Sequence, residues 1–194
     1  MAADDRPTNI LVVGVGGQGT ILASELICHV LMTAGYDVKK SEVHGMSQRG
    51  GRVESHVRFG RKVFSPLIVR GEVDYLVGFE MAETLRSLQW LHSGAKVLAD
   101  TKAVLPYTSQ VGEAPYPFDA LERIRQQGYE LIVVEGEEIA SRAGDVRTAN
   151  IVLIGALARL LPVDRKVWEG AIRDNMPKKF VDTNLRAFGL GYEV

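Results

Sequence analysis

The sequence predicts an α/β fold, namely a single Rossmann-like domain over residues 1–194 with a mostly parallel sheet and helices on both faces. Three observations lead to this class. Short apolar runs typical of buried strands alternate with segments of helical periodicity. A glycine-rich turn joins the first such run to the first helix. No internal repeat, low-complexity stretch or linker divides the 194 residues.

The first half of the chain carries most of the informative patterns. Residues 10–13 form a continuous apolar run, as expected for a buried strand, and a helix should follow from Thr20 to about Gly35. Residues 37–43 predict a second strand, which would complete a βαβ unit. Apolar and polar residues alternate over 52–59, which predicts a half-exposed strand with His56 on its solvent side. A turn at Gly60 into residues 62–64 then predicts a β-hairpin inserted after the second strand.

The second half returns to alternating elements and ends in a helical C-terminal region. Polar caps, glycines and prolines mark where the elements begin and end. The predicted strands are 75–79, 96–99 and 131–134; the predicted helices are 81–91, 118–127, 148–161, 164–175 and 178–188, the last ending at Gly189.

The turn after the first strand has the spacing of a dinucleotide-binding loop. Gly14, Gly16 and Gly19 match G-x-G-x-x-G between a strand and a helix, with Gly17 and Gln18 inside the motif. Glu42 ends the second strand, where an acidic residue would bind ribose hydroxyls. This pattern fits an independent NAD(P)- or FAD-binding oxidoreductase. It also fits a ligand-free scaffold in which the glycines only let the helix pack on the strand.

The loop after the second strand is a second candidate site. Its side chains provide a hydroxyl, an amide and a guanidinium, and its glycines allow close backbone approach, which suits a phosphate or carboxylate. The loop contains His44, Ser47, Gln48, Arg49, Gly50 and Gly51. His44 is the one histidine in a suspect loop and the only candidate for a catalytic role among the four histidines. Both loops should leave the carboxyl ends of neighbouring parallel strands, where open α/β sheets bind ligands.

A cluster of positive charge follows this loop. Six basic residues and one acidic residue lie between Met46 and Arg70, for a local formal charge of +5. This cluster is either the solvated face of the hairpin or a docking surface for a partner subunit or an anionic ligand.

Composition narrows the function classes. The formal net charge is −1, so no overall field favours nucleic acid or an anionic membrane. The single Cys28 excludes an intramolecular disulfide and leaves no cysteine pair for zinc or an iron–sulfur cluster. The N-terminus lacks a secretory pattern and the most apolar helix is too short for a membrane span, which predicts a soluble cytoplasmic protein.

The two loops together resemble a known family. Gly14–Gly19 and the segment 41–51, followed by similar stretches at 56–60, 65–68, 150–157 and 184–188, resemble the gamma-type domain of 2-oxoacid:ferredoxin oxidoreductases, and among these the indolepyruvate-oxidising branch. The resemblance covers nearly the whole chain.

The resemblance implies a heteromeric enzyme that oxidatively decarboxylates a 2-oxoacid, here an aryl pyruvate, to an acyl-CoA while it reduces ferredoxin. Thiamine diphosphate and [4Fe-4S] clusters would belong to a larger alpha-type partner subunit, and coenzyme A would be a co-substrate. This chain would carry no cofactor, would be inactive alone, and could form a homodimer when isolated. The loop residues and Asn150 would face the partner's active site as loop-forming or contacting residues, and the family motif assigns a catalytic role to none of them.

Overall fold

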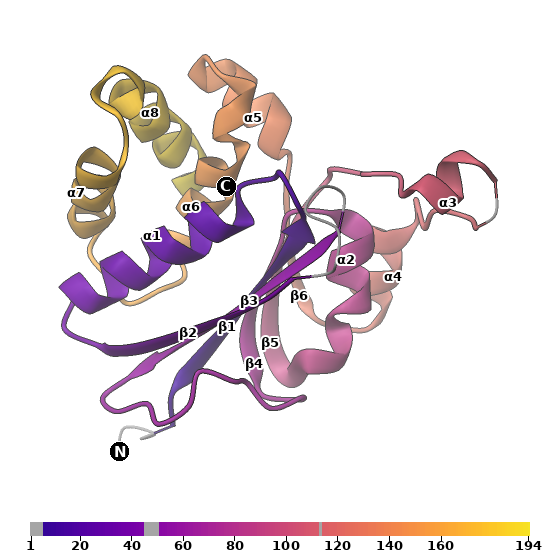
Figure 1. The fold of residues 1–194 in the computed structure, drawn as a ribbon, viewed down its shortest axis with the longest axis horizontal. Coiled ribbons are helices and arrows are strands. Elements are labelled where there is room, and N and C mark those ends of the chain that lie inside the picture. Colours follow the sequence, from indigo (N-terminus) through magenta and orange to yellow (C-terminus); the bar gives the residue numbers. More distant parts are fainter. Residues whose placement is uncertain (1–5, 45–50, 113) are drawn as a thin grey trace.

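One six-stranded sheet organises the chain in the order β2-β3-β1-β4-β5-β6 (Figure 1). The computed structural model describes residues 6–44, 51–112 and 114–194. The strands are β1 (Thr8–Val15), β2 (Asp37–His44), β3 (Arg52–Gly60), β4 (Val73–Gly78), β5 (Leu91–Asp100) and β6 (Glu130–Val134). The α-helices are α1 (Thr20–Thr33), α2 (Met81–Arg86), α3 (Tyr107–Gln110), α4 (Ala120–Gln126), α5 (Gly136–Ala143), α6 (Ala149–Ala158), α7 (Arg165–Asn175) and α8 (Val181–Tyr192), with short 3-10 turns η1 (Leu88–Trp90), η2 (Val146–Thr148) and η3 (Lys178–Phe180).

The sheet is mostly parallel, as predicted. β4 pairs in parallel with β1 and with β5, and β5 pairs in parallel with β6. β3 is antiparallel to both of its neighbours, so β2 on its far side runs in the same direction as β1. The predicted βαβ unit therefore has an antiparallel strand inserted between its two strands.

The predicted hairpin was placed on the wrong pair of segments. β3 does not pair with residues 62–64, which form no strand; it pairs along its whole length with β2 on one side and β1 on the other. An eight-residue partner offers far more ladder hydrogen bonds than a three-residue one. This position also makes β3 an interior strand, so the prediction of a half-exposed strand was wrong: Glu54 and His56 are 8% and 3% exposed.

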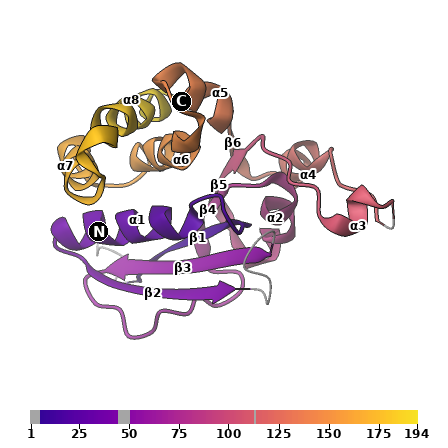
Figure 2. The same cartoon turned by 45° about the horizontal axis from the view of Figure 1, so that its top comes forward.

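Alternate side chains of β1 point into two different cores, one on each face of the sheet. Ile10 and Val12 pack with residues of α1 and α5 to α8, whereas Leu11 and Val13 pack with Ile124 of α4 and neighbours. Figure 2 shows α1 and the C-terminal helices above the sheet and α2 and α4 beside its other face. Helices on both faces and a helical C-terminal region are thus confirmed. Within the described ranges no helix is both long and apolar enough to cross a membrane.

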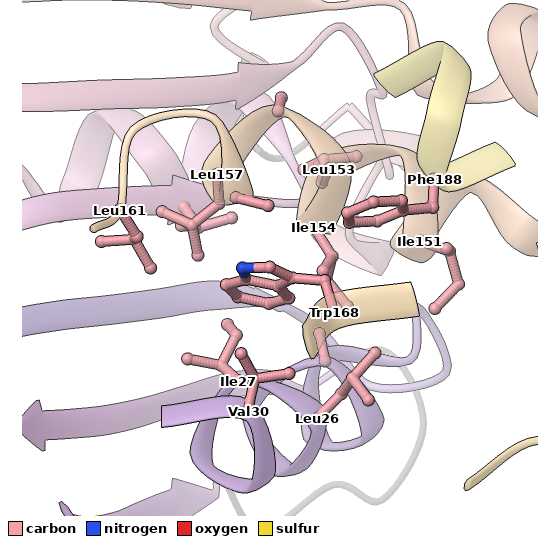
Figure 3. Close-up of a cluster of buried hydrophobic side chains, with 14 of the residues drawn as sticks. Leu26, Ile27, Val30, Ile151, Leu153, Ile154, Leu157, Leu161, Trp168 and Phe188 are labelled. Atoms are coloured by element: carbon pink, nitrogen blue, oxygen red, sulfur yellow. The ribbon is translucent and has the colours of Figure 1, made fainter. Parts of the chain in front are cut away.

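Trp168 of α7 fills the centre of the larger core. Its side chain is fully buried, with residues of α1 on one side and residues of α6 on the other (Figure 3). The labelled neighbours are Leu26, Ile27, Val30, Ile151, Leu153, Ile154, Leu157, Leu161 and Phe188. This packing fixes the C-terminal helices over α1 and so positions the first turn of α6 beside the first turn of α1.

α6 and α8 contact each other through their backbones. A Cβ atom added to Gly155 would lie 2.3 Å from the carbonyl oxygen of Phe188, and one added to Gly191 would lie 2.1 Å from that of Val152. Gly191 therefore serves close helix packing rather than helix termination. Gly189 does not end the helix as predicted, and α8 continues to Tyr192, three residues beyond it.

Candidate functional site

The glycine loop makes a tight turn between β1 and α1. Gly17 and Gly19 have φ angles of +103° and +78°, a region that residues with a Cβ rarely adopt. Gly14 is needed for a different reason, because an added Cβ would lie 2.8 Å from Gln18 Oε1 and 2.9 Å from Phe79 Cβ. The loop thus requires glycine both for its backbone angles and for its close packing against the end of β4.

Gln18 holds this turn in place. Its Oε1 accepts a hydrogen bond from Val15 N at 2.7 Å, and its Nε2 donates to the Phe79 carbonyl at 2.7 Å. The carboxamide therefore joins the carboxyl ends of β1 and β4. Gln18 was predicted as a loop contact; in the structure it braces the loop while it also lines the adjacent pocket.

The second candidate loop ends beside the first. Gly16 N donates a 2.8 Å hydrogen bond to the carbonyl of Gly51, so the two loops meet. Ser47, Gln48, Arg49 and Gly50 lie outside the described residues, and of His44 only the backbone, at the end of β2, is described. The two strands that carry the loops, β1 and β2, were predicted to be neighbours, but β3 lies between them. Their carboxyl ends nevertheless lie at the same edge of the sheet.

Asn150 lies at this edge, as predicted. It belongs to the first turn of α6 and is 8% exposed. A Cβ added to Gly19 would lie 2.8 Å from Asn150 Nδ2, so the asparagine occupies the space that the glycine leaves free. This contact joins the first turns of α1 and α6.

A pocket of about 290 Å³ opens at this point. It lies beyond the carboxyl ends of β1, β4 and β5. At β1 the strand order reverses, because β2 lies on one side of β1 and β4 on the other. Such switch points are the usual ligand sites of open α/β sheets. The pocket is lined by Gly17, Gln18, Phe79, Asp100, Lys102, Glu137, Val146, Arg147, Ala149 and Asn150.

Charges of both signs line the pocket, and most of them are paired. Lys102 forms an ion pair with Glu137. Arg147 forms an ion pair with Asp145 just outside the pocket, at 2.6 Å, and this hydrogen-bonded partner lowers the pKa of Asp145 to about 2. The Arg147 side chain is 73% exposed, and it is held by Asp145 and lies over the ring of Phe180. The lining therefore suits a polar ligand rather than an apolar one.

Asp100 is the buried acid of the pocket. It is 3% exposed, and burial raises its pKa to about 6 although its Oδ1 accepts hydrogen bonds from Gly136 N and Lys102 N. Gly136 permits this close approach, since an added Cβ would lie 2.6 Å from Asp100 Oδ2. Near neutral pH this carboxyl therefore holds a proton for part of the time.

The raised pKa of Asp100 predicts a pH-dependent stability. Between about pH 3 and pH 7 the folded chain keeps this proton longer than the unfolded chain does, so the free energy of unfolding should fall as the pH rises. The total loss is about 3 kcal/mol. Urea unfolding should be measured for Asp100→Asn and wild type over this pH range. The free energy of unfolding of the variant minus that of wild type should rise by this amount as the pH rises. Parallel pH curves for the two proteins would contradict the assignment.

Glu80 anchors the connection that passes over α2. Its carboxylate caps α2 by accepting from Glu83 N at 2.8 Å, and it accepts from Val104 N at 3.1 Å and from the Tyr116 hydroxyl. Burial and this hydrogen bond raise the pKa of Tyr116. The 1% exposed Glu80 thus ties residues 104 and 116 to the end of β4, beside the pocket.

Sequence reasoning missed several lining residues. Phe79, Asp100 and Lys102 follow β4 and β5, and Glu137 and Arg147 lie near the starts of α5 and α6. The sequence did point to the first three, because each lies at or directly after the carboxyl end of a buried strand. The candidate residues at the ends of the first two predicted strands rest on that same reason. Glu137 and Arg147 carry no comparable signal, because they reach the pocket through helix packing.

Glu42 does not lie where a dinucleotide-binding acid would. It forms an ion pair with Lys40 of the same strand, and β3 separates that strand from β1. At the usual strand spacing β2 therefore lies about 10 Å from β1 instead of about 5 Å. This arrangement disfavours the independent dinucleotide-binding enzyme. In the described part of the chain no group of three His, Cys, Asp or Glu side chains is placed to hold a metal ion.

The fold and the pocket define a Rossmann-like α/β protein whose candidate site is an edge built from two meeting loops. Residues 9–194 match the family model described as pyruvate ferredoxin/flavodoxin oxidoreductase. The chain therefore belongs to the pyruvate ferredoxin/flavodoxin oxidoreductase family, and it is a small subunit of a 2-oxoacid:ferredoxin oxidoreductase.

Individual relatives agree with this family. The chain is 40% identical over 188 residues to the indolepyruvate oxidoreductase subunit IorB of Archaeoglobus fulgidus, which covers 95% of this chain and 93% of that protein. It is 38% identical to the subunit of the same name from Thermococcus kodakarensis, covering 94% and 93% of the two chains. The gamma subunit of a keto/oxoacid ferredoxin oxidoreductase from Geobacter sulfurreducens has the same fold, with a TM-score of 0.71, 25% identity and 96% of each chain covered.

Proposed function

We propose that the whole chain, residues 1–194, is the small subunit of an indolepyruvate:ferredoxin oxidoreductase. This subunit is of the gamma type in the family as a whole and is called the beta subunit in the indolepyruvate enzyme. The complex would convert an aryl pyruvate and coenzyme A to an acyl-CoA and reduce ferredoxin. The names of relatives at 38–40% identity support this substrate class. The predicted cytoplasmic location belongs to the same proposal.

One observation carries the assignment of the site. The hydrogen bond from Gly16 N to the Gly51 carbonyl brings the two loops together at the switch point of the sheet. Around them the described residues supply backbone, amide and charged groups, but no nucleophile paired with a base. Such an edge can contact a ligand without transforming it. We infer that Gly14, Gly16, Gly17, Gln18, Gly19, His44, Ser47, Gln48, Arg49, Gly50, Gly51 and Asn150 border an active site completed by another subunit.

The redox chemistry is assigned to that other subunit. The sequence contains one cysteine, and burial raises the pKa of Cys28 to about 11, so its thiol is a poor ligand for iron. An iron–sulfur cluster needs several thiolates, which this chain does not have. We propose that thiamine diphosphate and the [4Fe-4S] clusters reside in the larger alpha-type subunit, which also passes electrons to ferredoxin.

Co-purification tests this assignment. The tagged chain, co-expressed with the thiamine-dependent large subunit, should purify as a complex that contains thiamine diphosphate and iron. The same chain expressed alone should contain neither. Calorimetric titration of the isolated chain with NAD(H), NADP(H) and FAD should give no heat of binding. Micromolar binding of any of these, or failure of the two subunits to associate, would refute the proposal.

A further inference from the structure

The connection between β3 and β4 spans residues 61–72, and its part 61–71 covers a part of the sheet that has no helix. In Figure 2 the helices lie above β2 and β3, and below these strands runs this connection. The strand register shows which side chains share that lower face: Ser41 lies beside His56 and Val43 beside Glu54. Ile68 N donates to His56 Nδ1 at 3.2 Å, so the connection crosses the same face. A single layer of irregular chain therefore lies between the sheet and solvent here.

Hydrogen bonds and two buried side chains hold the backbone of this connection in one conformation. Arg58 donates to the carbonyls of Ser65 and Leu67 at 3.2 and 2.9 Å. Val63 N donates to Asp37 Oδ2 at 2.9 Å. The side chains of Val63 and Ile68 are 2% and 4% exposed and serve as apolar anchors. The connection is thus fixed at both ends and in the middle.

Between these anchors the connection displays large apolar side chains to solvent. Phe64 is 90% exposed, more than any other large apolar residue in the described chain, and Leu67 and Val69 are 55% and 61% exposed. Val43 of the edge strand β2, on the same face of the sheet, is 53% exposed. Three such side chains on one short connection, with Val43 on the sheet face that this connection covers, mark an interaction surface rather than ordinary scattered exposure.

The charge around these residues is mainly positive. Residues 61–72 contain Arg61, Lys62 and Arg70 and one acidic residue, Glu72, and Lys62 lies 3.8 Å from Asp37 Oδ2. Of the rest of the basic cluster predicted from the sequence, Arg49 lies outside the described residues, Arg52 pairs with Glu54 at 2.6 Å, and Arg58 binds backbone carbonyls. The outward positive charge of the cluster is therefore concentrated on the same connection as Phe64.

We propose that Val43, Arg61, Lys62, Phe64, Leu67, Val69 and Arg70, here called the 61–71 surface, dock onto an acidic, apolar patch of the larger subunit. The proposal rests on the proposed function, which supplies a partner chain. A second copy of this chain is a poor occupant. In a twofold interface each surface would face the same excess of cations, three against the single Glu72 of the connection, and Asp37 is already paired with Lys62.

The test measures the affinity of the full chain for the purified large subunit. One variant, Phe64→Ser/Leu67→Ser, removes apolar contacts, and a second, Arg61→Glu/Lys62→Glu/Arg70→Glu, reverses the charge. Phe118→Ser is the matched control, because Phe118 is 68% exposed and lies outside this surface. Each 61–71 variant should raise Kd at least about tenfold. The loss from charge reversal should shrink at high salt. The Phe64→Ser/Leu67→Ser variant should keep the thermal midpoint of the isolated wild-type chain, whereas the charge reversal also removes the Lys62–Asp37 ion pair and the contact of Arg70 with Trp90 and should lower that midpoint slightly.

The outcomes separate the surface from the function. If wild type and both variants bind the large subunit equally well, the surface is wrong and the proposed function stands. If Phe118→Ser weakens binding as much as Phe64→Ser/Leu67→Ser does, the surface is also wrong. If the variants abolish only a homodimer of the isolated chain, the surface belongs to self-association and the proposal falls. If wild type does not bind the large subunit, the proposed function fails with it.

Discussion

Gly155→Leu is expected to destabilise the chain by about 4 kcal/mol, enough to prevent folding of a marginally stable domain. The added Cβ alone would lie 2.3 Å from the Phe188 carbonyl oxygen and 2.8 Å from Tyr192 N. These are backbone atoms of α8, so relief requires movement of the whole helix. Because α8 also packs on α5 and α6, that movement would open the core around Trp168.

The control for this prediction is Gly170→Ala in α7. Nothing lies within 4 Å of the Cβ position of Gly170. Alanine there should raise the free energy of unfolding by about 0.5–1 kcal/mol, since it favours the helix and restricts the unfolded chain. Urea unfolding and circular dichroism measure both variants. A folded Gly155→Leu protein with wild-type stability would show that the two helices do not meet in this way.

Glu80→Ala is expected to cost about 3–5 kcal/mol, because it removes the acceptor of three donors at once. Glu83 N, Val104 N and the Tyr116 hydroxyl would lose their partner in a buried site. The start of α2 and the connection at 104–116 should loosen together. Hydrogen exchange at Val104 should therefore accelerate along with the drop in stability measured by urea unfolding.

Glu80→Gln provides the matched control. It keeps one oxygen acceptor in nearly the same place, so it should lose about 1–2 kcal/mol and retain most of the protection at Val104. Equal losses for the alanine and glutamine variants would indicate that the hydrogen bonds of the carboxylate do not hold the connection.

The fold class followed from local patterns, whereas the pairing of strands did not. The apolar runs and the glycine turn are properties of adjacent residues, and they predicted the alternation of strands and helices correctly. The partner of β3 is a non-local choice between β2 and residues 62–64, and the alternating pattern of residues 52–59 fits both. The burial of Glu54 and His56 depends on that choice, because only an interior strand under the 61–71 connection has both faces covered.

The sequence predicted only part of the candidate site. The glycine loop and Asn150 were recognised from the sequence, and they meet in the structure through Gly19. Asp100 and Lys102 lie at the end of β5 and just after it, where the strand end was a signal that the prediction did not use, whereas Arg147 of η2 reaches the site only through helix packing. Glu42 shows the converse case, since a correct motif spacing failed when β3 was inserted between the two strands.

The central claim is that this chain completes an active site whose cofactors lie in the larger subunit. The most direct test is to titrate the chain into the purified large subunit and measure acyl-CoA formation from indolepyruvate, coenzyme A and oxidised ferredoxin. We expect negligible activity from either protein alone and a rate that rises to a plateau at equal amounts of the two. Full activity of the large subunit alone, or any turnover by this chain alone, would contradict the account.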